Sequence, residues 1–111
     1  MVYDEALADR IREAVQRRTG LSEKRMFGGL AFMIDGNLAV AAAGHGGLLL
    51  RVDPAQTEAL AAEPRAERFV MRGRTMNGWL HVDVDTDTPD AELHRWVGIG
   101  VAYAGSLPPK G

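Results

Sequence analysis

Hydrophobic periodicity predicts a helix at each end of the chain. Near the N-terminus, three apolar residues recur at the spacing i, i+4, i+8 and predict an amphipathic helix over residues 3–18: Leu7, Ile11 and Val15. The stretch "DTPDAELHRWVGIGVAYAGSL" predicts a final helix with Thr88 as its N-cap and Pro89 at its first position.

Between these helices, short apolar runs bounded by glycine and other turn residues predict five strands. The runs cover residues 30–34, 38–43, 48–52, 67–72 and 79–84. "DGN" between the first two is a strong hairpin signal, and "GRTMNG" is a predicted tight connection between the last two. A short helix follows the third strand, with Asp53 as N-cap and Pro54 at its first position.

The predicted element order is α-β-β-β-α-β-β-α. Consecutive strands joined by short turns form antiparallel pairs, so we expect an α+β fold with one antiparallel sheet and helices mainly on one face. No repeat or linker interrupts the pattern, and residues 1–111 are predicted to form a single domain.

Small residues suggest how the last helix packs. Strict alternation places Ala39, Ala41 and Ala43 on one face of the second strand, and the last helix carries Gly98, Gly100 and Gly105. We interpret the two sets as a matched close contact between helix and strand. Self-association through the glycine-bearing helix is the alternative.

Composition excludes several classes of protein. There is no cysteine, which removes disulfides, thiolate nucleophiles and zinc sites with cysteine ligands. The longest apolar run, "WVGIGVAYAG", is about half of the roughly 20 residues that a membrane span needs, and the N-terminus does not resemble a signal peptide. We therefore expect a cytoplasmic protein without a membrane partner. The net charge of −2 disfavours non-specific nucleic-acid binding.

The stretch "KRMFGG" (24–29) places a basic pair before two glycines. A Walker loop needs its lysine and hydroxyl after the glycines and a helix behind them, and a dinucleotide site needs GxGxxG before a helix. Here the basic residues come first and a predicted strand follows. The favoured interpretation is that Gly28 and Gly29 let the chain bend or pass close to a neighbouring strand.

The second concentrated stretch, "RFVMRGRTMNGWLHVD", combines basic and aromatic residues. Alternation places Trp79 and His81 on the face of the last strand opposite Leu80 and Val82, and Arg51 on the corresponding face of the third strand. A binding face is predicted from these residues: Phe27, Arg51, Arg72, Arg74, Met76, Trp79 and His81. The alternative is a solvated face whose arginines pair with Asp53, Glu67 and Asp83.

No catalytic or metal site is predicted. His45, His81 and His94 show no HxH or HxxxH spacing, and "VDVDTDTPD" lacks the central glycine and closing glutamate of a calcium loop. Serine and threonine residues occur in neither a GxSxG nor an SxxK motif. We therefore assign no catalytic residue, metal or cofactor.

Several motifs in order give the chain a family resemblance. "MFGGLAFMIDGNLAV", "LLLRVD", "RGRTMNGWLHVD" and the ending "GSLPPK" resemble the N-terminal domain of the TfoX family, named for a bacterial regulator of competence genes. The residues that match the family motif are Met26, Phe27, Gly28, Gly29, Gly36, Arg51, Gly73, Arg74, Met76, Gly78 and Trp79. The resemblance implies a single-domain member with an α+β fold similar to the secretion-chaperone-like class, and it implies no catalytic activity.

Two functional hypotheses follow. The first is a non-enzymatic, regulatory interaction module that binds another protein or itself through Phe27, Arg51, Arg74, Met76 and Trp79. The second is a nucleic-acid-associated protein in transcription control or RNA modification, which would use Arg25, Arg72 and Arg74 with Trp79 stacking on a base.

Overall fold

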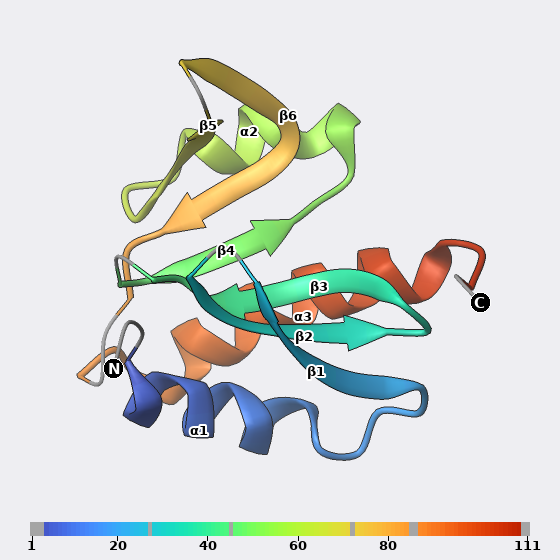
Figure 1. The fold of residues 1–111 in the computed structure, drawn as a ribbon. Helices are drawn as coiled ribbons and strands as arrows, with labels where there is room; N and C mark the ends of the chain where they lie inside the picture. Colours follow the sequence, from blue (N-terminus) through green and yellow to red (C-terminus); the bar gives the residue numbers. More distant parts are fainter. Residues whose placement is uncertain (1–3, 27, 45, 72, 85–86, 110–111) are drawn as a thin grey trace.

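The computed structural model describes residues 4–26, 28–44, 46–71, 73–84 and 87–109. In these residues the chain forms one antiparallel sheet with its helices gathered on one face (Figure 1). The helical elements are α1 (Glu5–Val15), the 3-10 turn η1 (Pro54–Gln56), α2 (Thr57–Ala61) and α3 (Asp90–Ser106). The strands are β1 (Leu21–Met26), β2 (Gly29–Ile34), β3 (Asn37–Ala42), β4 (Leu48–Arg51), β5 (Ala66–Met71) and β6 (Arg74–Val82), in the spatial order β1-β2-β3-β4-β6-β5.

The predicted α+β class is confirmed, with one strand more than the pattern indicated. β1 pairs with β2 from Leu21↔Ile34 to Met26↔Gly29, and four of its six residues are exposed. It is an edge strand held by main-chain pairing, so its sequence lacks the apolar alternation that marks a half-buried strand. Arg12 of α1 hydrogen-bonds to Glu23 of β1, and this contact lowers the pKa of the glutamate carboxyl.

The turns show which predicted connections were correct. Asp35 and Gly36 both have positive φ angles, 51° and 83°, and form the two-residue β2–β3 hairpin that "DGN" predicts. "GRTMNG" is not a six-residue connection, however. β6 begins directly after Gly73, whose φ is 77°, and residues 74–78 belong to the strand.

The helix starts also differ in detail. Asp53 caps η1 as predicted, because its carboxylate accepts a hydrogen bond from the amide of Ala55 at 2.9 Å. The last helix begins one residue later than expected, with Pro89 and not Thr88 at the N-cap position. Both boundaries keep the proline outside the hydrogen-bonded interior of a helix, where it would remove a donor.

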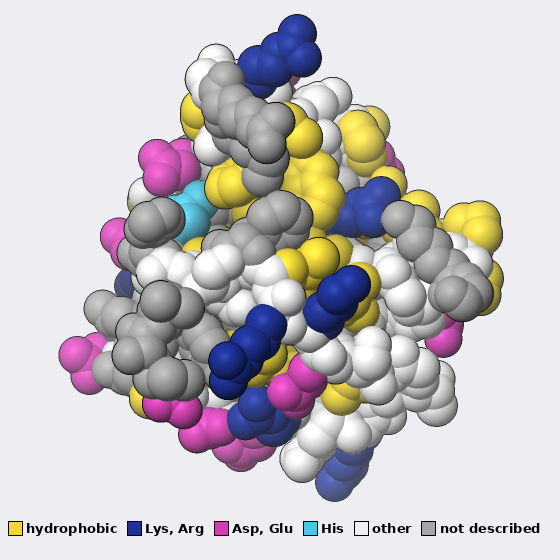
Figure 2. All heavy atoms as spheres, in the orientation of Figure 1, with side chains coloured by type: hydrophobic (Ala, Val, Ile, Leu, Met, Phe, Trp, Pro, Cys, Tyr) yellow, Lys and Arg dark blue, Asp and Glu magenta, His cyan; other side chains and the backbone are white. Residues whose placement is uncertain are grey.

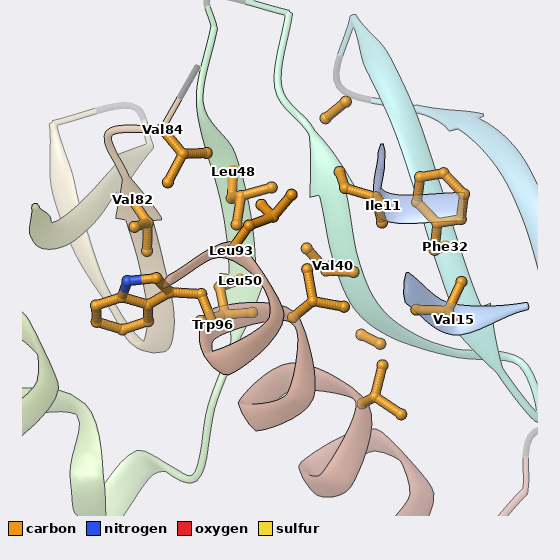
Figure 3. Close-up of a cluster of buried hydrophobic side chains, with 14 of the residues drawn as sticks. Ile11, Val15, Phe32, Val40, Leu48, Leu50, Val82, Val84, Leu93 and Trp96 are labelled. Carbon is orange, nitrogen blue, oxygen red and sulfur yellow. The ribbon is translucent and has the colours of Figure 1, made fainter. Parts of the chain in front are cut away.

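The core lies between the sheet and the helices α1 and α3. Figure 3 shows Trp96 and Leu93 of α3 among strand residues such as Leu50 and Val82, all of them fully buried. The apolar stripe predicted for the first helix is buried here as well. Trp96 donates its indole N–H to Glu92 at 3.0 Å, which satisfies its polar atom beside an apolar core.

A bulge in β3 changes how α3 meets the sheet. Phe32 pairs with Val40 and Met33 with Leu38, so Ala39 is an extra residue and strict alternation fails at this point. Ala39 joins the core beneath α3, whereas Ala41 faces the other side. A Cβ at Gly100 would collide with the carbonyl oxygen of Ala39, which confirms the predicted close contact at this one glycine.

Gly98 and Gly105 do not take part in that contact. A Cβ built at either position meets no atom within 4 Å. The prediction that all three glycines of the helix face the alanine strand was therefore wrong for two of them. Successive helix residues are rotated by about 100° about the helix axis, so residues two and five positions away from Gly100 face other directions.

A side-chain hydrogen bond holds the segment that follows α3. The side-chain amide nitrogen of Asn37, at the start of β3, donates to the carbonyl of Pro108 at 3.0 Å and ties the segment after α3 to the β2–β3 hairpin.

Within the described residues, no helix has both the length and the hydrophobicity that crossing a bilayer requires.

Candidate functional site

The sheet surface opposite α3 carries its own apolar cluster. Four residues on it are buried, and four larger ones are partly buried against them: Ala31, Leu38, Ala41 and Leu49, with Met26, Met33, Phe69 and Trp79. We call this surface the open face, because none of the described helices covers it. Viewed from this side, hydrophobic side chains gather in the upper middle of the molecule, with Lys and Arg side chains around them (Figure 2).

Arg51 lies on the open face between two aromatic rings. It pairs across the sheet with Trp79, and directly paired residues share a face. Its guanidinium carbon lies 5.6 Å from the centre of the Trp79 ring and 5.7 Å from that of Tyr103. Both distances are those of cation–π contacts. The structure thus places Arg51 and Trp79 together, as alternation indicates, and adds an aromatic residue from α3.

Tyr103 reaches Arg51 because β3 and β4 separate. The two strands pair only from Val40↔Leu50 to Ala42↔Leu48, so Arg51 has no partner on β3. Figure 1 shows the strands diverging there, with the C-terminal half of α3 passing behind them. Tyr103 was not predicted from the sequence, because a helical pattern does not indicate that a side chain will pass the edge of a strand.

Arg51 forms no ion pair with any carboxylate in the part of the chain that the structure describes. Asp53 uses its carboxylate to cap η1, and the carboxylate of Glu67 lies near His81. Asp83 contacts Arg65 through its main-chain carbonyl. These three acids therefore do not neutralise Arg51. For this residue, the alternative of a solvated face with paired arginines does not hold.

His81 has a structural contact on the same face. Its Nε2 lies 2.8 Å from the carbonyl oxygen of Gly46, and a carbonyl can only accept, so Nε2 carries the proton. Its Nδ1 lies 3.5 Å from a carboxylate oxygen of Glu67. Both ring nitrogens therefore face protein groups, and His81 connects β6 to the β3–β4 turn and to β5.

The remaining predicted residues are more dispersed. Arg74 is exposed beside the β5–β6 turn, five residues along β6 from Trp79, and Met76 is half-buried on the same strand. Five extended residues span roughly 16 Å, so Arg74 does not adjoin Arg51. Phe27, Arg72 and His45 lie outside the described residues.

The position of Trp79 is fixed by an irregularity in β6. Arg68 pairs with Leu80 and Val70 with Thr75, so β6 has four residues between these pairs where β5 has one, and it forms a bulge there. Gly78 within the bulge has a φ of 87°, and its amide donates to the buried hydroxyl of Thr57 at 2.8 Å. Thr57 is a second residue that was not predicted from the sequence, because a threonine in the first turn of a helix is common without such a role.

Replacing Thr57 with valine keeps its volume and removes this acceptor. We expect the free energy of unfolding to fall by about 1–3 kcal/mol, because the buried amide of Gly78 loses its partner. Urea titration followed by circular dichroism measures the change. Thr57→Ser is the matched control, because it keeps the hydroxyl that Thr57→Val removes. Equal stability of Thr57→Val and the wild type would contradict the assigned role.

Shallow grooves extend the open face toward the edge strand β5. One, of about 350 Å³, is lined by Glu67, Arg68, Phe69, Val70 and His81. A second, of about 220 Å³, lies at the end of β5 beside Arg65 and Asp83. Val70, in this edge strand, is 56% exposed.

The glycines of "KRMFGG" are explained by main-chain geometry. Gly28 has a φ of 73°, which favours glycine. A Cβ at Gly29 would collide with the carbonyl oxygen of Ala42 on β3. β2 follows them, so this segment lacks the helix that a phosphate-binding loop places behind its glycines. The interpretation as a close approach between strands is confirmed.

Arg51, Trp79 and Tyr103 offer hydrogen-bond donors and ring faces, and their neighbours offer apolar surface. Among the described residues, no three histidine or carboxylate side chains come together as a metal site.

Comparison with known proteins gives a family. The model of the TfoX N-terminal domain matches residues 13–104, which include β1 to β6 and most of α3. No curated protein and no solved structure matches the chain. The matched segment contains the glycines of the β1–β2 connection, Arg51, and the Gly78–Trp79 bulge. The chain therefore belongs to the TfoX N-terminal domain family.

Proposed function

We propose that this protein is a non-enzymatic interaction module that binds another protein through its open face. The observation that carries the proposal is the apolar cluster around Leu49 and Trp79, which no described helix covers and beside which Arg51 forms no ion pair with any described residue. A partly exposed apolar cluster next to a stacked arginine is typical of protein-binding surfaces, where aromatic residues and arginine contribute most of the affinity.

Charge selects the kind of partner. By strand register the open face presents Lys24 and Arg51 as cations, and Glu67 lies at its margin beside His81. A partner segment with apolar and acidic side chains complements this surface in both respects. The family is named for a competence regulator. We therefore also propose a regulatory role linked to transcription.

Nucleic acid is the less favoured partner. Specific and non-specific binding both gain affinity from many phosphate contacts, and this chain has a net charge of −2. A shift of labelled DNA or RNA at low salt that weakens steeply as salt increases would replace the proposal by the nucleic-acid hypothesis.

Site-specific photo-crosslinking tests the proposal. Benzoylphenylalanine is placed at Lys24, exposed on the open face, or at His94, exposed on α3. After irradiation in cell extract, we expect a defined adduct from position 24 and none from position 94. Arg51→Ala combined with Arg74→Ala is expected to abolish the adduct while leaving the circular dichroism spectrum unchanged.

The double variant Arg17→Ala with Arg18→Ala, both exposed after α1, is the charge-matched control and is expected to retain the adduct. An adduct of equal yield from positions 24 and 94, or one that survives the loss of Arg51 and Arg74, would refute the open face as the binding surface. A crosslinked dimer of the chain would assign the face to self-association.

A further inference from the structure

We infer that Arg51, Trp79 and Tyr103 form a receptor for a single carboxylate, which anchors an acidic side chain of the bound protein segment. This inference rests on the proposed function and adds the chemical class of the ligand. It requires that the arginine is held in place, that its donors are free, and that a carboxylate fits better than a phosphate.

The two rings hold the guanidinium of Arg51. It contacts Trp79 at 5.6 Å and Tyr103 at 5.7 Å, and these residues come from β6 and α3, on either side of the point where β4 leaves β3. Contact with aromatic rings leaves the in-plane N–H groups of a guanidinium for a ligand. A side chain held in this way loses little entropy when a carboxylate arrives.

The donors of the three side chains have no acceptor within the described residues. No hydrogen bond joins the Arg51 guanidinium, the Trp79 indole N–H or the Tyr103 hydroxyl to another group there. None of these polar atoms is buried without a partner, so they are open to solvent. The guanidinium and the indole N–H can only donate, and Arg51 contacts both rings, so a ligand that only accepts, such as an ionised carboxylate, matches these groups.

The surroundings favour a carboxylate over a phosphate group. A guanidinium and a carboxylate are both planar and form two parallel hydrogen bonds. Two residues before Arg51 on the same face of β4, Leu49 is 3% exposed and shares the apolar cluster of the open face with the partly buried Trp79. A phosphate carries more charge than one arginine neutralises, and Lys24 lies three strands away in the sheet.

Two tripeptides that differ in one group test the inference: acetyl-Leu-Glu-Leu-amide and acetyl-Leu-Gln-Leu-amide. The probe is the Trp79 indole resonance in ¹H–¹⁵N spectra at constant ionic strength. We expect the glutamate peptide to bind about tenfold more tightly than the glutamine peptide. In Arg51→Gln both peptides are expected to bind equally, whereas Arg18→Gln, at an exposed position after α1, retains the tenfold difference.

The outcomes separate this inference from the proposed function. If both peptides shift Trp79 with equal affinity in the wild type, the carboxylate receptor is refuted and the open face remains a peptide-binding surface. If neither peptide shifts Trp79, the receptor is refuted, and crosslinking from position 24 still decides the proposed function. Displacement of the glutamate peptide by inorganic phosphate at a tenfold lower concentration than by acetate would assign the site to phosphate and overturn the inference.

Discussion

Replacing Gly100 with alanine is expected to lower the free energy of unfolding by about 2 kcal/mol. The added Cβ would collide with the main-chain carbonyl of Ala39 and come within 2.6 Å of Leu50 Cδ1. The carbonyl belongs to the bulged part of β3, so α3 must move away from the sheet to make room. Urea denaturation followed by circular dichroism measures the loss.

Gly98→Ala in the same helix is the matched control. Its Cβ meets nothing within 4 Å, and alanine favours the helix over glycine by up to about 1 kcal/mol. We therefore expect this variant to be as stable as the wild type or more so. If Gly98→Ala and Gly100→Ala change stability equally, the close contact between α3 and β3 does not determine the packing of the helix.

Replacing Gly29 with alanine is expected to cost about 3 kcal/mol, because the clash lies within the sheet itself. The new Cβ would overlap the carbonyl oxygen of Ala42 and lie 3.1 Å from the amide nitrogen of Gly44, so β2 and β3 would have to separate at this end. Thermal denaturation followed by circular dichroism measures the loss.

Gly28→Asn separates this clash from the general effect of losing a glycine. Gly28 has a φ of 73°, and a Cβ built there would lie 4.0 Å from its nearest neighbouring atom. Asparagine tolerates this backbone conformation better than most residues with a side chain. We expect Gly28→Asn to cost much less than Gly29→Ala. The opposite order would mean that the backbone conformation at residue 28, and not the approach of the strands, requires the glycine pair.

The fold was predictable wherever burial imposes a period on the sequence. The stripe Leu7, Ile11 and Val15 marked α1, and "DGN" marked the hairpin at Asp35 and Gly36. β1 was not predictable by the same means, since it is exposed on most positions and is held by main-chain hydrogen bonds to β2. The bulge at Ala39 was also missed, because one extra residue leaves no trace in a run of alanines and valines.

The site was predictable in part. Alternation in β4 and β6 was sufficient to place Arg51 and Trp79 on one face, and the structure pairs them directly. Tyr103 and Thr57 required three-dimensional information, since one comes from a helix behind the sheet and the other acts through the Gly78 bulge. Arg74 lies too far along β6 to join Arg51, which adjacency in a motif does not indicate.

The two tryptophans give the most direct test of the open face as the recognition surface. Trp79 lies on that face. Trp96 is buried on the opposite side of the sheet, and its indole N–H donates a hydrogen bond to Glu92. When the crosslinked partner is identified and added to ¹⁵N-labelled protein, the account predicts that the Trp79 indole and Arg51 Nε–H resonances shift together while the Trp96 indole resonance stays in place. A shift of Trp96 and α3 resonances with Trp79 and Arg51 unchanged would contradict it.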